Sequence, residues 1–475
     1  MPTVAVNRDR LFEALNQEYT DLAFDDLCFD FGIELDDIDI EDNQVVYKLD
    51  IPANRYDLLC LQGIALALNT FRQLQPYPSY KKLPGNIKIK VKKSAEKIRP
   101  FVCAAVLRNV SFDENTYADF IELQDKLHMN ICRRRKYASI GTHDLDTVKP
   151  DFVYEALAPK DIVFQALKQT EVMDAGKLME TYETDMFFKQ YIGLIKDSEV
   201  YPVIKDSNGV ICSLPPIVNG NHSKMSKNTK NVLIEVTALD LTKARVVLDT
   251  MVSMFSIYCE NKFSVEEVAI EYEVEPESRN SKFPDMDYRK TTVSQEYINN
   301  RIGVEQSSKT IADSLSKMAL SACVDKADSD QIHVTIPPTR HDILQACDIM
   351  EDAAVAFGFN NLPKTLPKTV AIGKQQQLNK LMNLMRKGVS QAGYTECLTF
   401  ALCSRDDVSS KLRQPLGADV VHIGNPKTLE FQVCRTSLLP GILKTAANNK
   451  NLPLPLKLFE IQDCVVQRVG VFSVG

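Results

Sequence analysis

The stretch Ile51-Pro-Ala-Asn-Arg-Tyr-Asp-Leu-Leu59 recurs later in the chain as Ile336-Pro-Pro-Thr-Arg-His-Asp-Ile-Leu344. Both copies share the pattern I-P-x-N/T-R-x-D, followed by an apolar residue and Leu. Each copy ends a run of alternating apolar and polar residues, as in a half-buried strand, and leads into apolar residues at helical spacing. Proline ends such a strand, and an Asp suits the start of the next helix. We therefore expect two related small modules, each a helix, a strand, a proline turn and a helix.

The length of 475 residues predicts several domains rather than one. Between the two copies, short β-like runs mix with amphipathic helices, which is typical of an α+β domain. A proline-containing linker from Asn361 onwards separates the second copy from the last part of the chain. We expect a multidomain α+β protein with four parts: residues 1–85 with the first copy, 90–275 as the central domain, 285–362 with the second copy, and 368–475 as a final domain.

The composition excludes several classes of protein. Hydrophobic residues make up 44% of the chain and charged residues 25%, so it is not disordered throughout. The formal net charge of −7 gives no global positive field, so any nucleic-acid site must be local. No apolar run is long enough to cross a membrane, and the 12 cysteines show no C-x-x-C spacing. We expect a cytoplasmic protein in a reducing compartment, without a membrane partner.

Two basic segments are candidates for a local nucleic-acid site. Residues 81–100 are rich in Lys and hold a single Glu, and Arg133-Arg-Arg-Lys136 follows an amphipathic helix. The first segment can equally be the solvated face of a mixed protein. The second can stabilise the end of its helix through the helix dipole, or it can contact a phosphate backbone. Both interpretations stay open for each segment.

One predicted helix face gathers carboxylates. Asp348, Glu351 and Asp352 stand at i, i+3 and i+4, so they project from the same face, with Asp342 shortly before them. Oxygen ligands of this kind suit Mg²⁺. An acidic surface that pairs with basic side chains gives the same pattern, because like-charge repulsion at this spacing costs only about 0.2–0.5 kcal/mol. The residues alone leave a Mg²⁺ site and an acidic surface as alternatives.

The segment Lys224-Met-Ser-Lys-Asn228 resembles the mobile loop with which class I aminoacyl-tRNA synthetases handle ATP. That loop works beside an H-I-G-H element on a Rossmann core, and this sequence has neither, so we interpret the match as coincidence. No Ser-His-Asp or Cys-His nucleophile set can be assembled from sequence order either. The residues by themselves do not name a reaction.

Several longer blocks resemble the β subunit of eukaryotic cytosolic phenylalanyl-tRNA synthetase, in the same order along the chain. They run from residue 1 to about residue 463 and include Leu27-Cys-Phe-Asp-Phe-Gly, Ile51-Pro-Ala-Asn-Arg-Tyr-Asp, Ile140-Gly-Thr-His-Asp, Ala346-Cys-Asp-Ile-Met-Glu-Asp and Arg435-Thr-Ser-Leu-Leu-Pro-Gly. The resemblance implies a subunit that pairs with an α subunit, which holds the aminoacylation site, in an α₂β₂ heterotetramer. That enzyme joins phenylalanine to its tRNA and uses ATP and Mg²⁺.

The resemblance implies that the central domain is an editing domain, which hydrolyses tyrosine wrongly attached to phenylalanine tRNA. It places the editing pocket around Ile204, Ser213, Glu235 and Thr237. Within this pocket Glu235 is expected to accept a hydrogen bond from the tyrosine hydroxyl. Ser213 and Thr237 are expected to order the substrate or its attacking water, and Ile204 to contact the substrate.

The resemblance also bears on the acidic face and on the final domain. It implies a Mg²⁺ site, shared with the α subunit, on Asp342, Asp348, Glu351 and Asp352. Residues 368–475 resemble the start of a degenerate class II synthetase fold, an antiparallel sheet with helices that serves as interface and scaffold. After Asp463 the sequence departs from the family pattern, which indicates an incomplete product or a partner-dependent fold. A non-enzymatic nucleic-acid or protein-binding scaffold derived from that subunit is therefore the alternative function.

Overall fold

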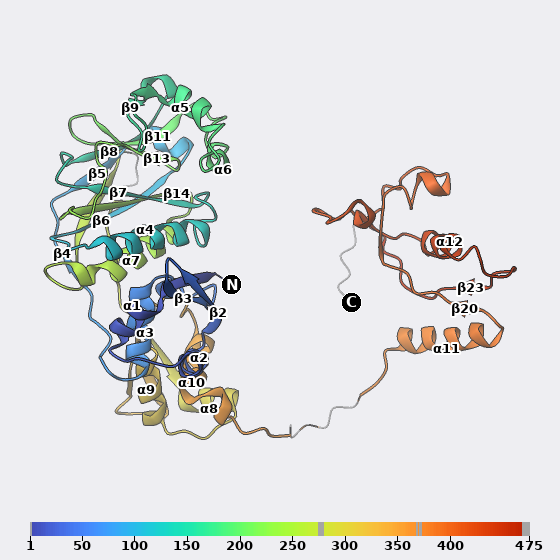
Figure 1. Cartoon of the computed structure of the whole chain (residues 1–475). Helices are drawn as coiled ribbons and strands as arrows, with labels where there is room; N and C mark the ends of the chain where they lie inside the picture. The colour runs from blue at the N-terminus through green and yellow to red at the C-terminus, as the bar shows by residue number, and fades with distance from the viewer. Residues whose placement is uncertain (1, 274–279, 367–368, 370–372, 468–475) are drawn as a thin grey trace. The chain divides into compact units, whose positions relative to one another are not determined.

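The repeat seen in the sequence shapes the first part of the chain in the computed structural model (Figure 1). The chain divides into two units, Met1–Lys364 and Thr365–Gly475, and each is described by itself. The residues that the structure describes are 2–273, 280–366, 369 and 373–467.

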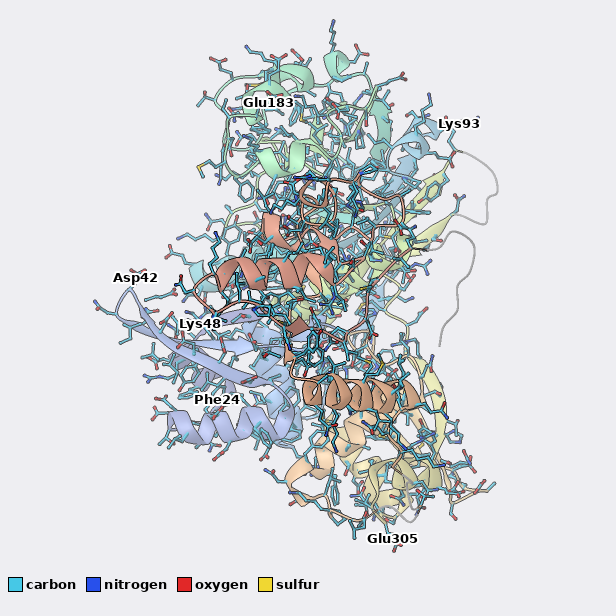
Figure 2. All side chains as sticks on the ribbon, turned by 90° about the vertical axis from the view of Figure 1, so that its right-hand side faces the viewer. Phe24, Asp42, Lys48, Lys93, Glu183 and Glu305 are labelled. Atoms are coloured by element: carbon cyan, nitrogen blue, oxygen red, sulfur yellow. The ribbon has the colours of Figure 1, made fainter. Side chains whose placement is uncertain are left out.

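The first copy of the repeat closes a small module. Its elements are β1 (Thr3–Asn7), α1 (Arg8–Leu15), α2 (Asp21–Phe31), β2 (Glu34–Glu41), β3 (Gln44–Asp50), a 3-10 turn (Tyr56–Leu58) and α3 (Leu61–Phe71). The antiparallel sheet has the order β1-β3-β2, and the rings of Phe24 and Tyr47 stack with centroids 5.0 Å apart in its core. Asp42 and Asn43 join β2 to β3 at positive φ, as a tight hairpin turn requires. Figure 2 shows Asp42 at the tip of this hairpin and Phe24 on α2.

The second copy closes a module with the same order of elements. These are β17 (Arg289–Ser294), α8 (Gln295–Ile302), α9 (Ser308–Lys317), β18 (Ser321–Val324), β19 (Gln331–Ile336) and α10 (Ala346–Phe357). The sheet order β17-β19-β18 again puts the last strand in the middle. The duplication therefore extends well beyond the quoted pattern. The rest of each module needs only apolar residues at matching positions, so its sequence can diverge without losing the fold.

The Arg and Asp of each copy bind one another in the turn that precedes the last helix. The Nη2 atom of Arg55 lies 2.8 Å from Oδ2 of Asp57, and the Nη2 atom of Arg340 lies 2.7 Å from Oδ2 of Asp342. All four side chains are largely buried, and each arginine also donates from Nε to its aspartate. The repeated residues therefore fix the two turns through two-point ion pairs.

The central domain is built on one long sheet, with the order β13-β12-β11-β8-β5-β15-β6-β14-β7 and with β4 and β16 pairing along β15. Helices α4 (Glu114–Met129) and α7 (Leu241–Phe255) lie together against β6, β14 and β7 (Figure 1). The strands are β4 (Lys81–Leu83), β5 (Lys88–Val91), β6 (Phe101–Leu107), β7 (Ala138–Asp144), β8 (Phe152–Leu157), β11 (Tyr201–Lys205), β12 (Ile211–Leu214), β13 (Val218–Asn219), β14 (Val232–Ala238), β15 (Ser264–Tyr272) and β16 (Ser281–Phe283). A smaller excursion holds β9 (Val163–Phe164), β10 (Met173–Asp174), α5 (Ala175–Tyr182) and α6 (Lys189–Ile192).

Strand β14 is buried along its whole length, between β6 on one side and β7 on the other. A strand in this position is expected to be apolar, and most of β14 is. Glu235 and Thr237 are the exceptions. They are two residues apart, so their side chains point to the same face of the sheet. Their polar groups must find partners inside the domain, because buried polar groups without partners are costly.

The second unit has short elements and a small core. They are α11 (Gln377–Gln391), β20 (Thr395–Glu396), β21 (Leu402–Cys403), β22 (Val433–Cys434), α12 (Leu439–Asn448) and β23 (Leu458–Phe459). Its described residues form two separate strand pairs, β20 with β23 in parallel and β21 with β22 antiparallel, in place of the expected antiparallel sheet. The buried cluster holds Cys403, Val408, Val420 and Val433, which is too little apolar surface to cover a sheet. Neither unit has a described helix that is long and apolar enough to cross a membrane.

Gly63 marks the place where α3 passes closest to the proline turn. A Cβ atom at this position would lie 1.8 Å from the backbone oxygen of Asp57 and 3.0 Å from Sδ of Met254. The ion pair with Arg55 holds Asp57 in place, so the turn cannot easily move away. We expect Gly63→Ala to lower the free energy of unfolding by about 1–3 kcal/mol, the usual cost of overpacking, as measured by urea denaturation.

Gly193→Ala is the matched control, because a Cβ atom there meets no other atom within 4 Å. It should change the free energy of unfolding by less than about 0.5 kcal/mol. Equal effects of the two substitutions would contradict the close packing of α3 on the turn.

Candidate functional site

A cavity of about 400 Å³ opens at the β7 edge of the central domain. Its size suits a small molecule or one end of a larger ligand. Most of its wall is apolar, and one carboxylate, that of Glu235, belongs to it. The lining residues are Tyr117, Ile121, Gln124, Arg135, Ser139, Ile140, Thr142, Leu167, Lys168, Phe187, Phe188, Ser213, Pro215, Pro216, Ile217, Val218, Asn219, Lys224, Met225 and Glu235.

The carboxylate of Glu235 is the most unusual group in this wall. Its residue is 1% exposed, and the hydroxyl of Ser213 donates a hydrogen bond of 2.9 Å to its Oε1. Its Oε2 is buried and has no hydrogen-bond partner among the described residues. A buried carboxylate oxygen without a donor is costly, so a ligand that brings an O–H or N–H group into the cavity would be favoured there.

Gly141 makes room for this carboxylate. It pairs with Glu235 across the β7–β14 ladder, and a Cβ atom on it would lie 2.1 Å from Oε1 of Glu235. Any larger residue would therefore push the carboxylate out of its place. The sequence alone assigned Gly141 no role, but a glycine inside a strand often marks close approach by another group.

His143 is a second residue that the sequence analysis did not single out. It lies on β7, on the same face as Gly141, and its ring is fully buried. Its Nδ1 atom lies 2.7 Å from Oγ of Ser223, which fixes the ring, and its Nε2 atom lies 3.8 Å from Oε1 of Glu235. That separation is too long for a hydrogen bond. The imidazole therefore lies next to the carboxylate without forming a hydrogen bond to it.

Arg135 contributes a cation to the wall from an unusual turn. Three successive residues, Arg133 to Arg135, have φ values of 46°, 53° and 63°, which are left-handed conformations. This turn directs Arg135 inward, where its guanidinium donates to the carbonyl of Ile217 at 2.8 Å and lies over the rings of Tyr191 and Phe187. Burial lowers the pKa of Arg135 from its usual value, yet that value is so high that the group stays charged.

The four predicted pocket residues do not all reach the cavity. Ser213 and Glu235 meet there, as described. Thr237 lies further along β14, where its hydroxyl is 3.1 Å from that of Ser139 and accepts a hydrogen bond of 3.2 Å from Nε of the buried Arg99. Ile204 pairs with Ser213 in the β11–β12 ladder and packs in the hydrophobic core. Neither Thr237 nor Ile204 is part of the cavity lining.

The segment that resembled a class I synthetase loop borders the cavity. Lys224 and Met225 are lining residues, with Met225 buried and Lys224 exposed. The exposed Lys168 is another lining residue. These two lysines give the cavity a positively charged border. Two residues of this segment thus belong to the site.

The four carboxylates of the predicted Mg²⁺ site are not gathered around one point. Arg340 binds both Asp342 and Asp352, with Nη2 to Oδ2 distances of 2.7 and 2.8 Å. Asp348 accepts two backbone N–H groups before the start of α10, each at 2.7 Å, and Glu351 is exposed. Burial raises the pKa of Asp352 to about 6, although Arg340 opposes this shift. Among the residues that the structure describes, no three His, Cys, Asp or Glu side chains are grouped so as to hold a metal ion.

Models of tRNA synthetase domains match the chain over nearly its whole length. They are the Phe-tRNA synthetase beta subunit B1 domain over residues 1–74, the B3/4 domain over 85–260, the tRNA synthetase B5 domain over 291–359 and the phenylalanyl tRNA synthetase beta chain CLM domain over 362–471. The cavity lies in the segment that the B3/4 model matches. These matches define the chain as a subunit of an aminoacyl-tRNA ligase.

Relatives of known name make the assignment specific. The phenylalanine–tRNA ligase beta subunit of Mus musculus is 50% identical over 99% of this chain and 82% of the mouse protein. That of Saccharomyces cerevisiae is 48% identical over 98% of this chain and 80% of the yeast protein. A crystal structure of an N-terminal fragment of the Pyrococcus horikoshii phenylalanyl-tRNA synthetase beta subunit matches with a TM-score of 0.68 and 28% identity, over 75% of this chain and 99% of the fragment. The chain belongs to the family of phenylalanine–tRNA ligase β subunits.

His128 supports strand β7 of the site only while its ring is neutral, so this support depends on pH. Its Nε2 atom accepts a hydrogen bond of 2.8 Å from the backbone N–H of Ile140 in β7, which requires a neutral ring nitrogen. Burial lowers the pKa of His128 to about 4. An unfolded histidine has a pKa of about 6.5, so between these values the unfolded chain binds the proton and the folded chain does not. Stability is therefore lost as the pH falls through this window.

We expect His128→Gln to lose less stability on acidification than the unaltered chain, because glutamine can accept the same hydrogen bond without titrating. When the pH falls from 7 to 5, the free energy of unfolding of the unaltered chain should decrease by about 2 kcal/mol more than that of His128→Gln, as measured by urea denaturation at both pH values. An identical loss in the two proteins would mean that His128 does not titrate between the folded and unfolded states.

Proposed function

We propose that the cavity around Glu235 is an editing site, which hydrolyses tyrosine wrongly attached to phenylalanine tRNA. Tyrosine differs from phenylalanine by one hydroxyl, and an apolar pocket cannot strongly reject a ligand that merely adds a hydroxyl. A second pocket that binds the hydroxyl makes the missing distinction, because phenylalanine would leave the polar group of that pocket unpaired. The observation that carries the proposal is the buried Oε2 of Glu235, which has no hydrogen-bond partner among the described residues and belongs to the one carboxylate in the lining of a largely apolar cavity.

The residues of the site have distinct proposed roles. Glu235 accepts the phenol O–H, and Ser213, which donates to its other oxygen, holds the carboxylate in position and orders the substrate or its attacking water. Thr237 acts from outside the cavity by joining β14 to Arg99. Ile204 supports Ser213 from the neighbouring strand. In the hydrolysis, the water oxygen bonds to the ester carbon, the bond to the ribose oxygen breaks, and that oxygen takes up a proton.

The same proposal covers the assembly in which the site works. The chain pairs with an α subunit in an α₂β₂ enzyme that attaches phenylalanine to its tRNA with ATP, and it supports tRNA binding there. The names of the relatives support this assignment, since each is the beta subunit of a phenylalanine–tRNA ligase. A cytoplasmic location is supported by an Arabidopsis thaliana relative, 44% identical, whose name carries that location.

A Mg²⁺ site shared with the α subunit stays a prediction for the acidic face of α10. Carboxylate oxygens suit this ion, which takes few protein ligands. Asp348 and Glu351 are the ligands that we propose this chain contributes. Asp342 and Asp352 are hydrogen-bonded to Arg340, and they would need to leave that arginine to bind a metal.

We expect Glu235→Ala to reduce kcat/KM for the hydrolysis of tyrosyl-tRNA by about 10- to 100-fold, which corresponds to a lost hydrogen bond to a charged acceptor of roughly 1.5–3 kcal/mol. Hydrolysis of phenylalanyl-tRNA should stay slow in both proteins. The measurement is the release of labelled tyrosine from mischarged phenylalanine tRNA.

Glu271→Ala is the matched control, because Glu271 lies on a strand of the same domain, is partly exposed and pairs with Lys88 outside the cavity. It should hydrolyse tyrosyl-tRNA at the unaltered rate. Undiminished hydrolysis by a folded Glu235→Ala protein would overturn the role of Glu235. A chain that hydrolyses neither ester, alone or with its α subunit, would favour the alternative of a non-enzymatic scaffold.

A further inference from the structure

The side chains of the left-handed turn at Arg133 to Arg135 line two different hollows of the surface. Arg135 lines the cavity, as described, while Arg133 and Arg134 are exposed and line a separate groove of about 620 Å³. Neighbouring Cα atoms are only about 3.8 Å apart, so the groove and the cavity approach one another on the two sides of this turn. The residues that line the groove are Ala53, Tyr56, Met129, Asn130, Ile131, Arg133, Arg134 and Lys243.

The groove is positively charged. Arg133, Arg134 and Lys243 line it, and none of its lining residues is acidic. Tyr56, from the proline turn of the first repeat, also lines it. The chain as a whole has a net charge of −7, so this concentration of cations is a local feature.

The side chains of Arg133 and Arg134 make no polar contact with the described residues that would stabilise the fold. Within the described parts of the chain, the guanidinium groups of Arg133 and Arg134 form no ion pair and no hydrogen bond with protein. Lys243 is different, since it pairs with Asp240 at 2.8 Å. The groove therefore offers two uncommitted cations beside a partly neutralised one.

The basic ribbon at residues 81–100, the other candidate from the sequence, is more fully paired. Lys88 lies 2.7 Å from Glu271, and Lys92 lies 2.8 Å from Glu273. Exposed pairs of this kind reduce the local positive field. The turn is therefore the better site for an anionic ligand.

Stabilisation of the end of α4, the other interpretation of these arginines, does not account for their side chains. The carbonyls in the last turn of the helix already accept backbone N–H groups: Lys126 from Asn130, Leu127 from Cys132, and His128 from Arg134 at 2.8 Å. The terminal carbonyls thus need no guanidinium. Three successive non-glycine residues in left-handed conformations are also strained, and such strain is often found at ligand sites.

We propose that this groove binds the phosphodiester backbone of tRNA next to the aminoacylated end, with Arg133 and Arg134 as its phosphate contacts. The inference rests on the proposed function, because an amino acid ester in the cavity leaves the preceding nucleotides outside it. Guanidinium groups suit phosphate oxygens because their donors form a planar fork. The contacts carry no base specificity, since they reach the backbone alone.

The test is the affinity of the full chain for an unmodified transcript of phenylalanine tRNA, measured by fluorescence anisotropy over a series of salt concentrations. The double variant Arg133→Glu with Arg134→Glu should bind about 10-fold or more weakly. For this variant, the slope of log K against the logarithm of the salt concentration should be shallower by about 1.4–1.8, because each lost phosphate contact reduces the slope by about 0.7–0.9. The variant Arg133→Lys with Arg134→Lys should keep most of the affinity, because it keeps the charge.

The matched control reverses the same charge on a remote surface. Lys309 and Lys326 are exposed residues of the second repeat module, and Lys309→Glu with Lys326→Glu should leave the affinity unchanged. The melting temperature of each variant reports whether it is folded. The inference is overturned if the arginine variant is folded and binds the transcript as the control does, or if the unaltered chain does not bind it at low salt. An acidic protein as the true ligand would give this second result.

Turnover of tyrosyl-adenosine by the unaltered chain separates this inference from the proposed function. This small ester can enter the cavity without any preceding nucleotide. If it is hydrolysed while the arginine variant binds tRNA normally, the groove assignment fails and the editing site stands. If the arginine variant loses tRNA binding but the ester is not hydrolysed, the groove assignment stands and the editing site fails.

Discussion

The burial of one carboxylate constrains the whole of the proposed site. Glu235 is 1% exposed and lies on a strand that is buried along its length and paired along both edges, so little bulk water surrounds its side chain. Taking a carboxylate out of water is expensive unless donors replace the water. Ser213 replaces part of it, and Gly141 leaves the space that the side chain needs. The oxygen that remains unpaired defines what the cavity can recognise, namely a ligand with a hydrogen to donate.

The surroundings of the cavity serve to hold these groups in place. His128 fixes strand β7 by accepting a hydrogen bond from the N–H of Ile140, next to Gly141 in the sequence. Arg99 is buried and donates to the carbonyls of Thr237 and Arg135, each at 3.1 Å, so it joins β14 to the left-handed turn. One buried cation thus links the carboxylate strand with the cationic wall. Rigid support of this kind is what a site needs to distinguish two substrates that differ by a single hydroxyl.

The repeated pattern has a structural role that its sequence does not reveal. In each copy the Arg binds the Asp two residues later. Tyr77, which follows the last helix of the first module, reaches the turn of the second copy, where its hydroxyl lies 2.7 Å from that of Thr339. In the second copy Arg340 also takes up Asp352. The spacing of the carboxylates correctly predicted that Asp348, Glu351 and Asp352 share one helix. It could not predict that Arg340, from the preceding turn, would form an ion pair with Asp352.

The sequence predicted the fold class and the repeat, because a turn that requires Pro, Arg and Asp leaves a pattern that can be read. It predicted only one strand in each module and missed the first strand, the first helix and the strands β2 and β18, because these elements have no fixed residue pattern. Ser213 and Glu235 came from the family resemblance, since they lie on strands that are not neighbours in the sheet and no local pattern could bring them together. Gly141 is different. The sequence reasoning predicted no strand around it, so the rule that a glycine inside a strand marks close packing could be applied only once β7 was seen.

The central claim is that the cavity binds a tyrosine side chain in preference to a phenylalanine side chain. A binding experiment measures this preference separately from the hydrolysis of the ester. The direct measurement is isothermal titration calorimetry of the chain with two non-hydrolysable amide analogues, one of tyrosyl-adenosine and one of phenylalanyl-adenosine. The unaltered protein should bind the tyrosyl analogue about 10-fold or more tightly, and Glu235→Ala should bind both with the same weak affinity. Equal affinities of the unaltered protein for the two analogues would contradict the account.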